Sequence, residues 1–262
     1  MYKHAIIRRP GKSSVRGLTS VDRGKPDFER LIEQHRHYTN TLSSLGLEVI
    51  ELEALEEFPD ACFTEDVAIV TPEVAVITRP GADSRRGETL HITDVLAKFR
   101  QLKYITEPGT IDGGDVLIID QSCVKRHCIV GLSTRTNQSG AEQLCAILSE
   151  YGYQGDIVDL GADVPAALHF KSSVNFIDSH TLLVTQTCFW LDCLSAYRKL
   201  VVPEGEEYAA NVVWINGKVL MPDGYPATQR LLEQNGFQTM VMPISEISKM
   251  DGGLTCLSLR LT

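Results

Sequence analysis

The sequence predicts an α/β protein made of five repeated units, and three observations support this fold class. Short apolar runs recur along the 262 residues and end in turn residues, which is the pattern of β-strands. A helix candidate or a polar stretch and then a second strand follow these runs, so strands and helices alternate. Such alternation also suits a doubly wound sheet, but the first strand-to-helix junction lacks the GxGxxG motif of a Rossmann fold. We therefore favour five units arranged about a pseudo-fivefold axis.

Each unit is expected to open with one short strand and to close with another. The opening strands are apolar runs such as HAIIR, which a Pro-Gly turn follows closely. We expect the opening strands at residues 4–8, 74–78, 128–132, 181–185 and 212–215. We expect the closing strands at residues 49–52, 104–106, 157–160 and 240–242.

Helices are expected between the opening and closing strands. Residues 27–46 carry apolar side chains at helical spacing, with Asp27 suited to the N-cap and Gly46 to the end of the helix. The same spacing predicts further helices over residues 92–102, 141–148 and 227–232. The fourth unit has the weakest pattern, at residues 191–200.

A loop and a further strand follow each closing strand, and these loops carry the reactive side chains. The five segments read PDACFTEDVAIV, GTIDGGDVLII, HFKSSVNFI, EYAANVVWI and DGGLTCLSLRL. Four of them contain a residue that can do chemistry, namely Asp66, Asp112, His169 and Cys256. About a fivefold axis, equivalent loops meet at one point. We therefore expect these four residues to be neighbours.

Composition excludes two broad classes of function. The formal net charge is −9, and no block of basic residues is present that could neutralise nucleic-acid phosphates. No stretch reaches the roughly 18 apolar residues of a membrane helix. Charges interrupt the first 25 residues before an apolar signal region forms, and the seven cysteines include no CxxC pair. We expect a cytoplasmic protein with reduced thiols.

Cys256 and His169 are candidates for nucleophilic and acid–base chemistry. Two glycines precede Cys256 in DGGLTC and allow the backbone to approach a ligand closely. A nucleophilic cysteine needs some exposure and a cationic environment, whereas most cysteines are simply buried. We expect that ordinary buried state for Cys62, Cys123, Cys128, Cys145, Cys188 and Cys193. His169 alone would more often be structural, but a cysteine on an equivalent loop favours a functional pair.

The acidic residues favour a cationic ligand. Asp60, Glu65 and Asp66 are interleaved with apolar residues, and Asp112 and Asp115 flank a Gly-Gly pair, where an ordinary turn is the alternative. Carboxylates facing a site of low dielectric are costly unless a cation neutralises them. The sequence lacks closely spaced metal-ligand motifs, so a guanidinium, whose planar fork suits carboxylates, is the better fit.

Arginines in polar loops could add an anion site. Arg85, Arg86 and Arg135 would ordinarily be solvated charges. Beside a cation site, however, they could bind the carboxylate of an amino-acid substrate.

The motifs, in order, resemble those of the dimethylarginine dimethylaminohydrolases. They are FTEDVAIV, TRPGADSRRGE, IDGGDV, GLSTRTNQSGAE, LHFKS and DGGLTCLSLR, with a few residues inserted near QSCVKRH. The resemblance spans nearly the whole chain and implies a single catalytic domain over residues 1–262. It also implies the fold of that guanidine-modifying superfamily, the pentein or five-bladed α/β propeller of ββαβ units.

By motif, the resemblance implies a nucleophile at Cys256, an acid–base at His169 and a supporting carboxylate at Asp112, a position that varies between Asp and Glu in the family. The implied guanidinium-binding carboxylates are Asp60, Glu65 and Asp66. Arg85 and Arg135 are implied for the substrate carboxylate, with the Met250 backbone and a flap near Leu18 completing the pocket.

The implied activity is hydrolysis of Nω-methylated L-arginine to citrulline and dimethylamine or methylamine, with no cofactor and no metal. The implied partner is this small-molecule substrate, on a monomer or homodimer that binds neither nucleic acid nor membrane. Two alternatives stay open: an arginine deiminase-like hydrolase, and an inactive protein that binds arginine derivatives. The deiminases usually carry an inserted helical module that this chain lacks.

Overall fold

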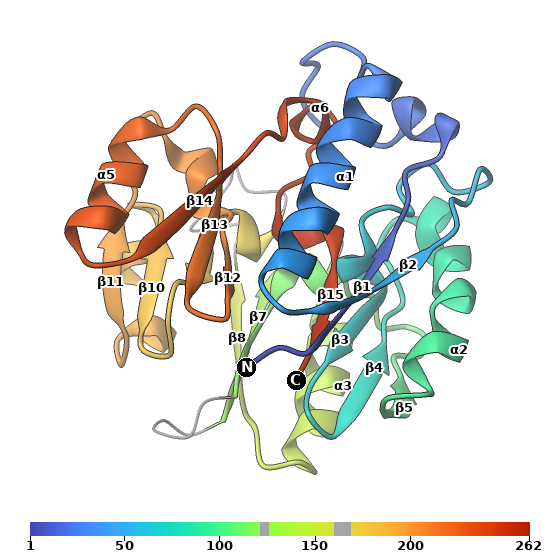
Figure 1. Ribbon diagram of the computed structural model, residues 1–262. Helices are drawn as coiled ribbons and strands as arrows, with labels where there is room; N and C mark the ends of the chain where they lie inside the picture. Colours follow the sequence, from blue (N-terminus) through green and yellow to red (C-terminus); the bar gives the residue numbers. More distant parts are fainter. Residues whose placement is uncertain (121–125, 160–168) are drawn as a thin grey trace.

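Five three-stranded sheets surround a common centre in the computed structural model, which describes residues 1–120, 126–159 and 169–262 (Figure 1). In every sheet the middle strand pairs antiparallel with the preceding unit's loop strand and parallel with its own closing strand. The first sheet joins the two ends of the chain, because a C-terminal strand pairs with the N-terminal one. The predicted fivefold repeat is confirmed.

The strands are short and give each unit the same order. The first sheet contains β15 (Leu259–Leu261), β1 (His4–Arg8) and β2 (Glu48–Leu52). The next two contain β3 (Ala68–Val70), β4 (Val74–Ile77) and β5 (Gln101–Tyr104), then β6 (Val116–Ile119), β7 (His127–Leu132) and β8 (Gln154–Asp159). The last two contain β9 (Val174–Phe176), β10 (Thr181–Val184) and β11 (Arg198–Val201), then β12 (Val213–Ile215), β13 (Lys218–Pro222) and β14 (Gln238–Met242).

Helices lie on the outside and connect the parallel strands. The longest are α1 (Phe28–Ser44), α3 (Gln138–Ser149) and α5 (Pro226–Gln234), and short turns form α2 (Thr93–Leu96) and α6 (Ser245–Ser248). As predicted, the side chain of Asp27 caps α1 by accepting from the Arg30 N–H, and Gly46 follows the helix with φ of +88°. Local signals thus define α1.

The core consists of apolar clusters that join neighbouring sheets and the helices packed on them. The middle strands are buried along almost their whole length, which explains their continuous apolar sequence. Tyr38 and Leu42 of α1 are fully buried against β1.

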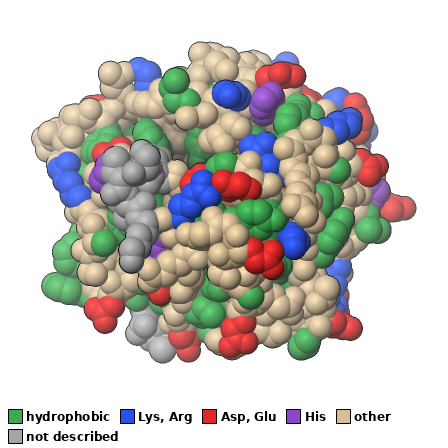
Figure 2. Space-filling model, turned by 90° about the horizontal axis from the view of Figure 1, so that it is seen from below, with side chains coloured by type: hydrophobic (Ala, Val, Ile, Leu, Met, Phe, Trp, Pro, Cys, Tyr) green, Lys and Arg blue, Asp and Glu red, His purple; other side chains and the backbone are tan. Residues whose placement is uncertain are grey.

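Acidic and basic side chains are interspersed on the face that Figure 2 shows. In the described part of the chain, no helix is long and apolar enough to cross a membrane.

The opening strand of the last unit differs from the prediction. Residues 212–215 were expected to open it, but β12 is the strand that follows the loop, and β13 takes the middle place between β12 and β14. Asn216 and Gly217, both with positive φ, join β12 and β13 in a two-residue hairpin. The polar Asn-Gly turn, rather than the first apolar run, marks the start of the unit.

Two predicted helices are also wrong in extent. The helix expected over residues 92–102 ends at Leu96, because a 3₁₀ stretch (Asp83–His91) precedes it and β5 begins at Gln101. The closing strand of this unit is therefore β5, which begins earlier than the predicted strand at residues 104–106. In the segment 191–200, the described residues form 3₁₀ turns (Cys188–Trp190 and Asp192–Leu194) and β11 instead of a helix. The expected insertion near QSCVKRH falls on residues outside the described ranges. Leu160, the last residue of the predicted closing strand 157–160, also lies outside them.

Candidate active site

The five equivalent loops meet at the centre of the ring, and each contains a 3₁₀ turn before its strand. The turns are Thr64–Val67, Gly113–Asp115, Phe170–Ser172, Glu207–Ala210 and Thr255–Leu257. Asp66 and Cys256 lie within their turns, whereas Asp112 and His169 lie immediately before theirs. Their predicted convergence is confirmed, because Asp66, His169 and Cys256 line one pocket and Asp112 contacts His169.

The pocket is small. Its volume is about 30 Å³, room for a few water molecules and too little for an amino acid, so an amino-acid ligand requires its walls to move. Eight of the ten predicted site residues line it: Leu18, Asp60, Asp66, Arg85, Arg135, His169, Met250 and Cys256. Asp112 and Glu65 lie behind the lining.

The Gly-Gly pair of IDGGD allows two loops to pack against each other. A Cβ on Gly113 would lie 1.9 Å from the backbone oxygen of Glu65. A Cβ on Gly114 would lie 2.8 Å from the His169 ring, and the N–H of Gly114 donates to Asp66 Oδ1 at 2.9 Å. Only glycine fits this close approach.

Cys256 is held as a neutral thiol in the empty pocket. Its side chain is 8% exposed, and burial raises its pKa to about 12, with further contributions from the nearby carboxylates of Asp66 and Glu65. A cation entering the pocket would oppose both effects. The thiolate is therefore favoured when a cationic ligand is bound.

His169 is held as an imidazolium. Burial alone would lower its pKa, but the carboxylates of Asp115, Asp66 and Asp112 outweigh burial and raise it to about 9. Its Nε2 lies 3.3 Å from Oδ2 of Asp112, which has no exposed surface. The ring can therefore carry a proton at neutral pH and deliver it to a leaving group.

Arg85 is already surrounded by carboxylates. Its Nη1 lies 2.5 Å from Oδ2 of Asp66, and its Nε and Nη2 donate to Glu88 at 3.0 and 2.8 Å. Burial favours a raised pKa for Asp66, but Arg85 and His169 lower it to about 2. Arg135 is less engaged, since Asp112 Oδ2 lies 3.9 Å from its Nη1. Arg86, by contrast, pairs with exposed Asp83.

Asp60 connects the pocket to the N-terminal segment above it. Its Oδ1 accepts from the backbone N–H of Leu18 at 2.9 Å, and burial raises the pKa of this carboxyl. The N–H of Ser20 donates to the carboxylate of Asp251, on the opposite wall. Asp251 itself has positive φ, at +55°. These two bonds hold the segment near Leu18 over the pocket.

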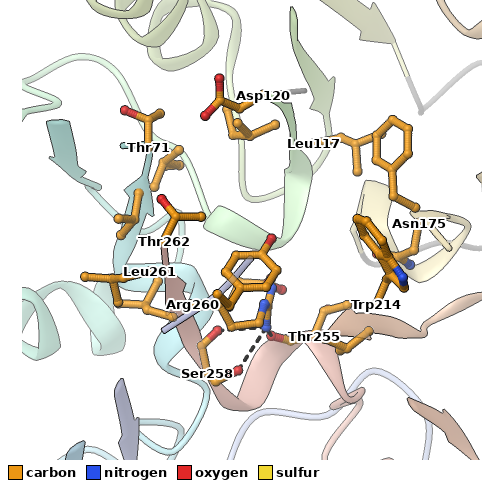
Figure 3. A pocket seen from close by; sticks show the side chains of 18 of the residues that line it. Thr71, Leu117, Asp120, Asn175, Trp214, Thr255, Ser258, Arg260, Leu261 and Thr262 are labelled. Carbon is orange, nitrogen blue, oxygen red and sulfur yellow. Dashed lines mark hydrogen bonds and ion pairs between the residues drawn. The ribbon is translucent and has the colours of Figure 1, made fainter. Parts of the chain in front are cut away.

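Glu65 faces away from this pocket. Its Oε1 accepts from Lys171 Nζ at 2.7 Å and from Arg260 Nη2 at 3.0 Å, and it lines a separate cavity of about 730 Å³ on the other side. Figure 3 shows that cavity, with Arg260 bonded to Ser258. Glu65 Oε2 is buried with no hydrogen-bond partner among the described residues. Its charge reaches Cys256, although its side chain does not line the pocket.

One cluster in the described residues has the spacing of metal ligands. Ligand atoms of Asp66, Asp112 and His169 all lie within 4.8 Å of one another. The Arg85 guanidinium already forms an ion pair with Asp66, and the His169 ring is hydrogen-bonded to Asp112. These three side chains are therefore suited to binding an organic cation and to carrying a proton.

The sequence analysis missed part of the pocket. Phe63, Asp251 and Gly252 also line it, and the DGG motif before Cys256 was the available signal for the last two. Of the cysteines expected to be buried, Cys145 and Cys193 are only partly buried, while Cys123 lies outside the described residues.

Comparisons of sequence agree with this geometry. A family model described as "N,N dimethylarginine dimethylhydrolase, eukaryotic" matches residues 23–204. The N(G),N(G)-dimethylarginine dimethylaminohydrolase of Pseudomonas aeruginosa is 38% identical over 262 residues, covering 99% of this chain and 100% of the relative. That of Streptomyces coelicolor is 36% identical, with coverage of 99% and 97%.

Comparisons of structure extend the similarity to the whole fold. The Pseudomonas aeruginosa enzyme, as a cysteine-to-serine mutant complexed with citrulline, matches with a TM-score of 0.93 at 37% identity over 99% of both chains. A histidine-to-glycine mutant bound as an adduct with S-methyl-L-thiocitrulline also gives 0.93, with coverage of 99% and 100%. The N-terminal domain of a cyanobacterial arginine dihydrolase, at 17% identity and a TM-score of 0.83 over 98% and 97%, shares the fold.

Proposed function

The chain belongs to the dimethylarginine dimethylaminohydrolase family, and on this premise we propose that it hydrolyses Nω-methylated L-arginine to L-citrulline and dimethylamine or methylamine. The observation that carries the proposal is the meeting of Cys256, His169 and Asp66 in one pocket. A buried thiol, an imidazolium and a carboxylate are the groups that substitution at a guanidinium carbon needs.

The substrate guanidinium would bind among the carboxylates of the pocket. Asp66 and Asp60 line the pocket, and Glu65 adds a negative charge from behind. A bound guanidinium does not lose its proton at physiological pH, so its positive charge is permanent. In this environment it lowers the free energy of forming the Cys256 thiolate, so binding and activation of the nucleophile are coupled.

The reaction then proceeds in two substitutions. The Cys256 thiolate attacks the ζ-carbon and forms a C–S bond, while His169 transfers its proton to the departing amine as the C–N bond breaks. Neutral His169 next deprotonates a water that attacks the resulting S-alkylthiouronium. As the C–S bond breaks, the hydroxyl proton of the adduct passes to the departing sulfur, which restores the Cys256 thiol, and citrulline forms. Proton transfer of this kind typically contributes about 10² to 10⁴-fold to the rate.

The substrate's own carboxylate would be bound mainly by Arg135. Arg85 lines the pocket but already shares its charge with Asp66 and Glu88, whereas Arg135 has its nearest carboxylate at 3.9 Å. The backbone at Leu18 and Met250 would close over the substrate. Because the pocket is smaller than an amino acid, we propose that the segment near Leu18 opens to admit the substrate.

The remaining expectations are part of the proposal. We propose one catalytic domain over residues 1–262, acting as a cytoplasmic monomer or homodimer. Size-exclusion chromatography with light scattering would distinguish the two assemblies, and a larger oligomer would contradict both.

The deciding experiment is incubation with asymmetric dimethylarginine while citrulline and dimethylamine are assayed together. Equal amounts of both products support the proposal. Conversion of unmethylated arginine with release of ammonia, and no reaction of the methylated substrate, would favour the deiminase alternative. Binding measured by calorimetry without either product would favour the inactive binding protein.

A further inference from the structure

A second carboxylate, Asp115, lies buried directly behind His169. It has no exposed surface, and its Oδ1 accepts from the backbone N–H of Phe170, the residue after His169, at 3.0 Å. Its Oδ2 accepts from the hydroxyls of Ser133 at 2.7 Å and Thr136 at 2.6 Å. Burial raises the pKa of Asp115, whereas these three donors and the His169 cation favour its charged form.

The partners of Asp115 belong to the loops that hold other site residues. The hydroxyl of Thr136 accepts from the backbone N–H of Asp112 at 3.1 Å. The hydroxyl of Ser133 accepts from the backbone N–H of Arg135 at 3.0 Å. One carboxylate therefore connects the loops of Asp112, Arg135 and His169.

We propose that Asp115 is a positioning residue that fixes the His169 loop and keeps the His169 ring positively charged until it gives its proton to the leaving amine. The proposal rests on the hydrolase function, because only that reaction assigns the proton a destination. Asp115 does not line the pocket, so it acts through His169 and not on the substrate.

The charges around His169 support this role. The carboxylates of Asp66, Asp112 and Asp115 face the ring, while the guanidiniums of Arg85 and Arg135 and the Cys256 thiol lie on the pocket side. Arg85 is bonded to Asp66, and Arg135 is the cation nearest Asp112. Asp115 makes the largest single charge interaction that raises the pKa of His169, and of the three carboxylates it is the one with neither guanidinium as an ion-pair partner among the described residues.

The variant Asp115→Asn removes the charge and keeps the shape. Its amide oxygen can still accept from the Phe170 N–H, and the Thr136 hydroxyl, which accepts one N–H bond, can rotate to accept a second from the amide. We expect the pKa of His169 to fall by about one unit or more, since one nearby charge is worth about 1 to 3 units. The alkaline limb of the kcat profile should move by the same amount, with KM changed less than about threefold. NMR of ¹³C-labelled histidine, with the resonance identified by its loss in His169→Gly, measures the pKa without turnover.

Asp178→Asn is the matched control. Asp178 accepts two backbone N–H bonds and one hydroxyl in the β9–β10 turn, away from the pocket, and its replacement should leave the His169 pKa and the kcat profile as in the wild type. An unchanged His169 pKa in folded Asp115→Asn would overturn the proposal, as would a uniform loss of kcat without a shift.

If Asp115→Asn does not fold, Thr136→Val tests the same link. It removes the hydroxyl between Asp115 and Asp112, and Thr136→Ser should restore it. We expect a fall in kcat of about fivefold or more in the valine variant and recovery in the serine variant; wild-type kcat in Thr136→Val would overturn the proposal. Failure of the wild type to hydrolyse methylarginine would instead refute the hydrolase function and leave the NMR result standing.

Discussion

Replacing Asp66 with Asn should make the Cys256 thiol more reactive while it weakens substrate binding. In the empty pocket the pKa of Cys256 is raised to about 12 from the usual 9.0, a difference of about 3 units or 4 kcal/mol. At pH 7.5 the thiolate fraction is then about 3 in 10⁵. Asp66 is the largest contributor after burial, so the buried acid that recognises the cation also suppresses the nucleophile.

The size of the effect follows from one lost charge. Removing a nearby like charge lowers a thiol pKa by about one unit, which raises the thiolate fraction about tenfold. Loss of the carboxylate also leaves Arg85 without its bond at 2.5 Å, and this freed cation acts in the same direction. The measurement is made at pH 7.5, where His169 is protonated in the wild type because its pKa is about 9.

Alkylation by iodoacetamide at pH 7.5, followed by digestion and mass spectrometry, gives the rate at each cysteine separately. Cys193 is the internal reference, because its pKa is raised to about 11 mainly by burial, with a contribution from Asp156. We expect Cys256 to react about tenfold faster in Asp66→Asn, and KM for dimethylarginine to rise at least tenfold. A Cys256 rate equal to or below that of the wild type would refute the electrostatic reasoning.

Three further predictions concern turnover and stability. Cys256→Ser should lower kcat by about 10⁴-fold or more with little change in melting temperature, and substantial residual turnover would remove Cys256 as nucleophile. His169→Gly should accumulate a covalent adduct visible by mass spectrometry, whereas wild-type turnover would exclude its acid–base role. The folded pKa of His169, about 9, exceeds the unfolded 6.5, so about 3 kcal/mol of stability is present below pH 6.5 and is lost as pH rises through 9. Urea denaturation at pH 6 and 9.5 tests this, and His169→Gln should show a smaller difference; equal differences would contradict the linkage.

The elements that the sequence predicts well are those with local signals. Helix α1 has its cap at Asp27 and its stop at Gly46, so its ends depend on neighbours in sequence. Strand β1 is a buried apolar run and could be recognised as such. The reactive loops were found because equivalent positions in a repeat carry Asp66 and Cys256.

The errors arise where neighbours in space decide the structure. The helical spacing of apolar residues continues to Leu102, but Leu102 lies in a strand because β5 pairs with β4. Likewise β12 and β13 are both apolar, and only sheet order decides which is the middle strand. Glu65 and Asp66 are adjacent in sequence yet face different cavities, because Lys171 and Arg260 bind Glu65 from far along the chain.

The sequence by itself determines the number of units, the alternation of strands and helices, and the residue types at each loop, since these depend on local spacing and composition. Only the tertiary structure decides which of those residues lie together and how their pKa values change. Closing the ring with β15 against β1 brings Cys256 beside acids some 190 residues earlier in the chain. Burial there, together with nearby carboxylates, makes the thiol a weak acid, and the carboxylates around the imidazole outweigh its burial and make it a strong base.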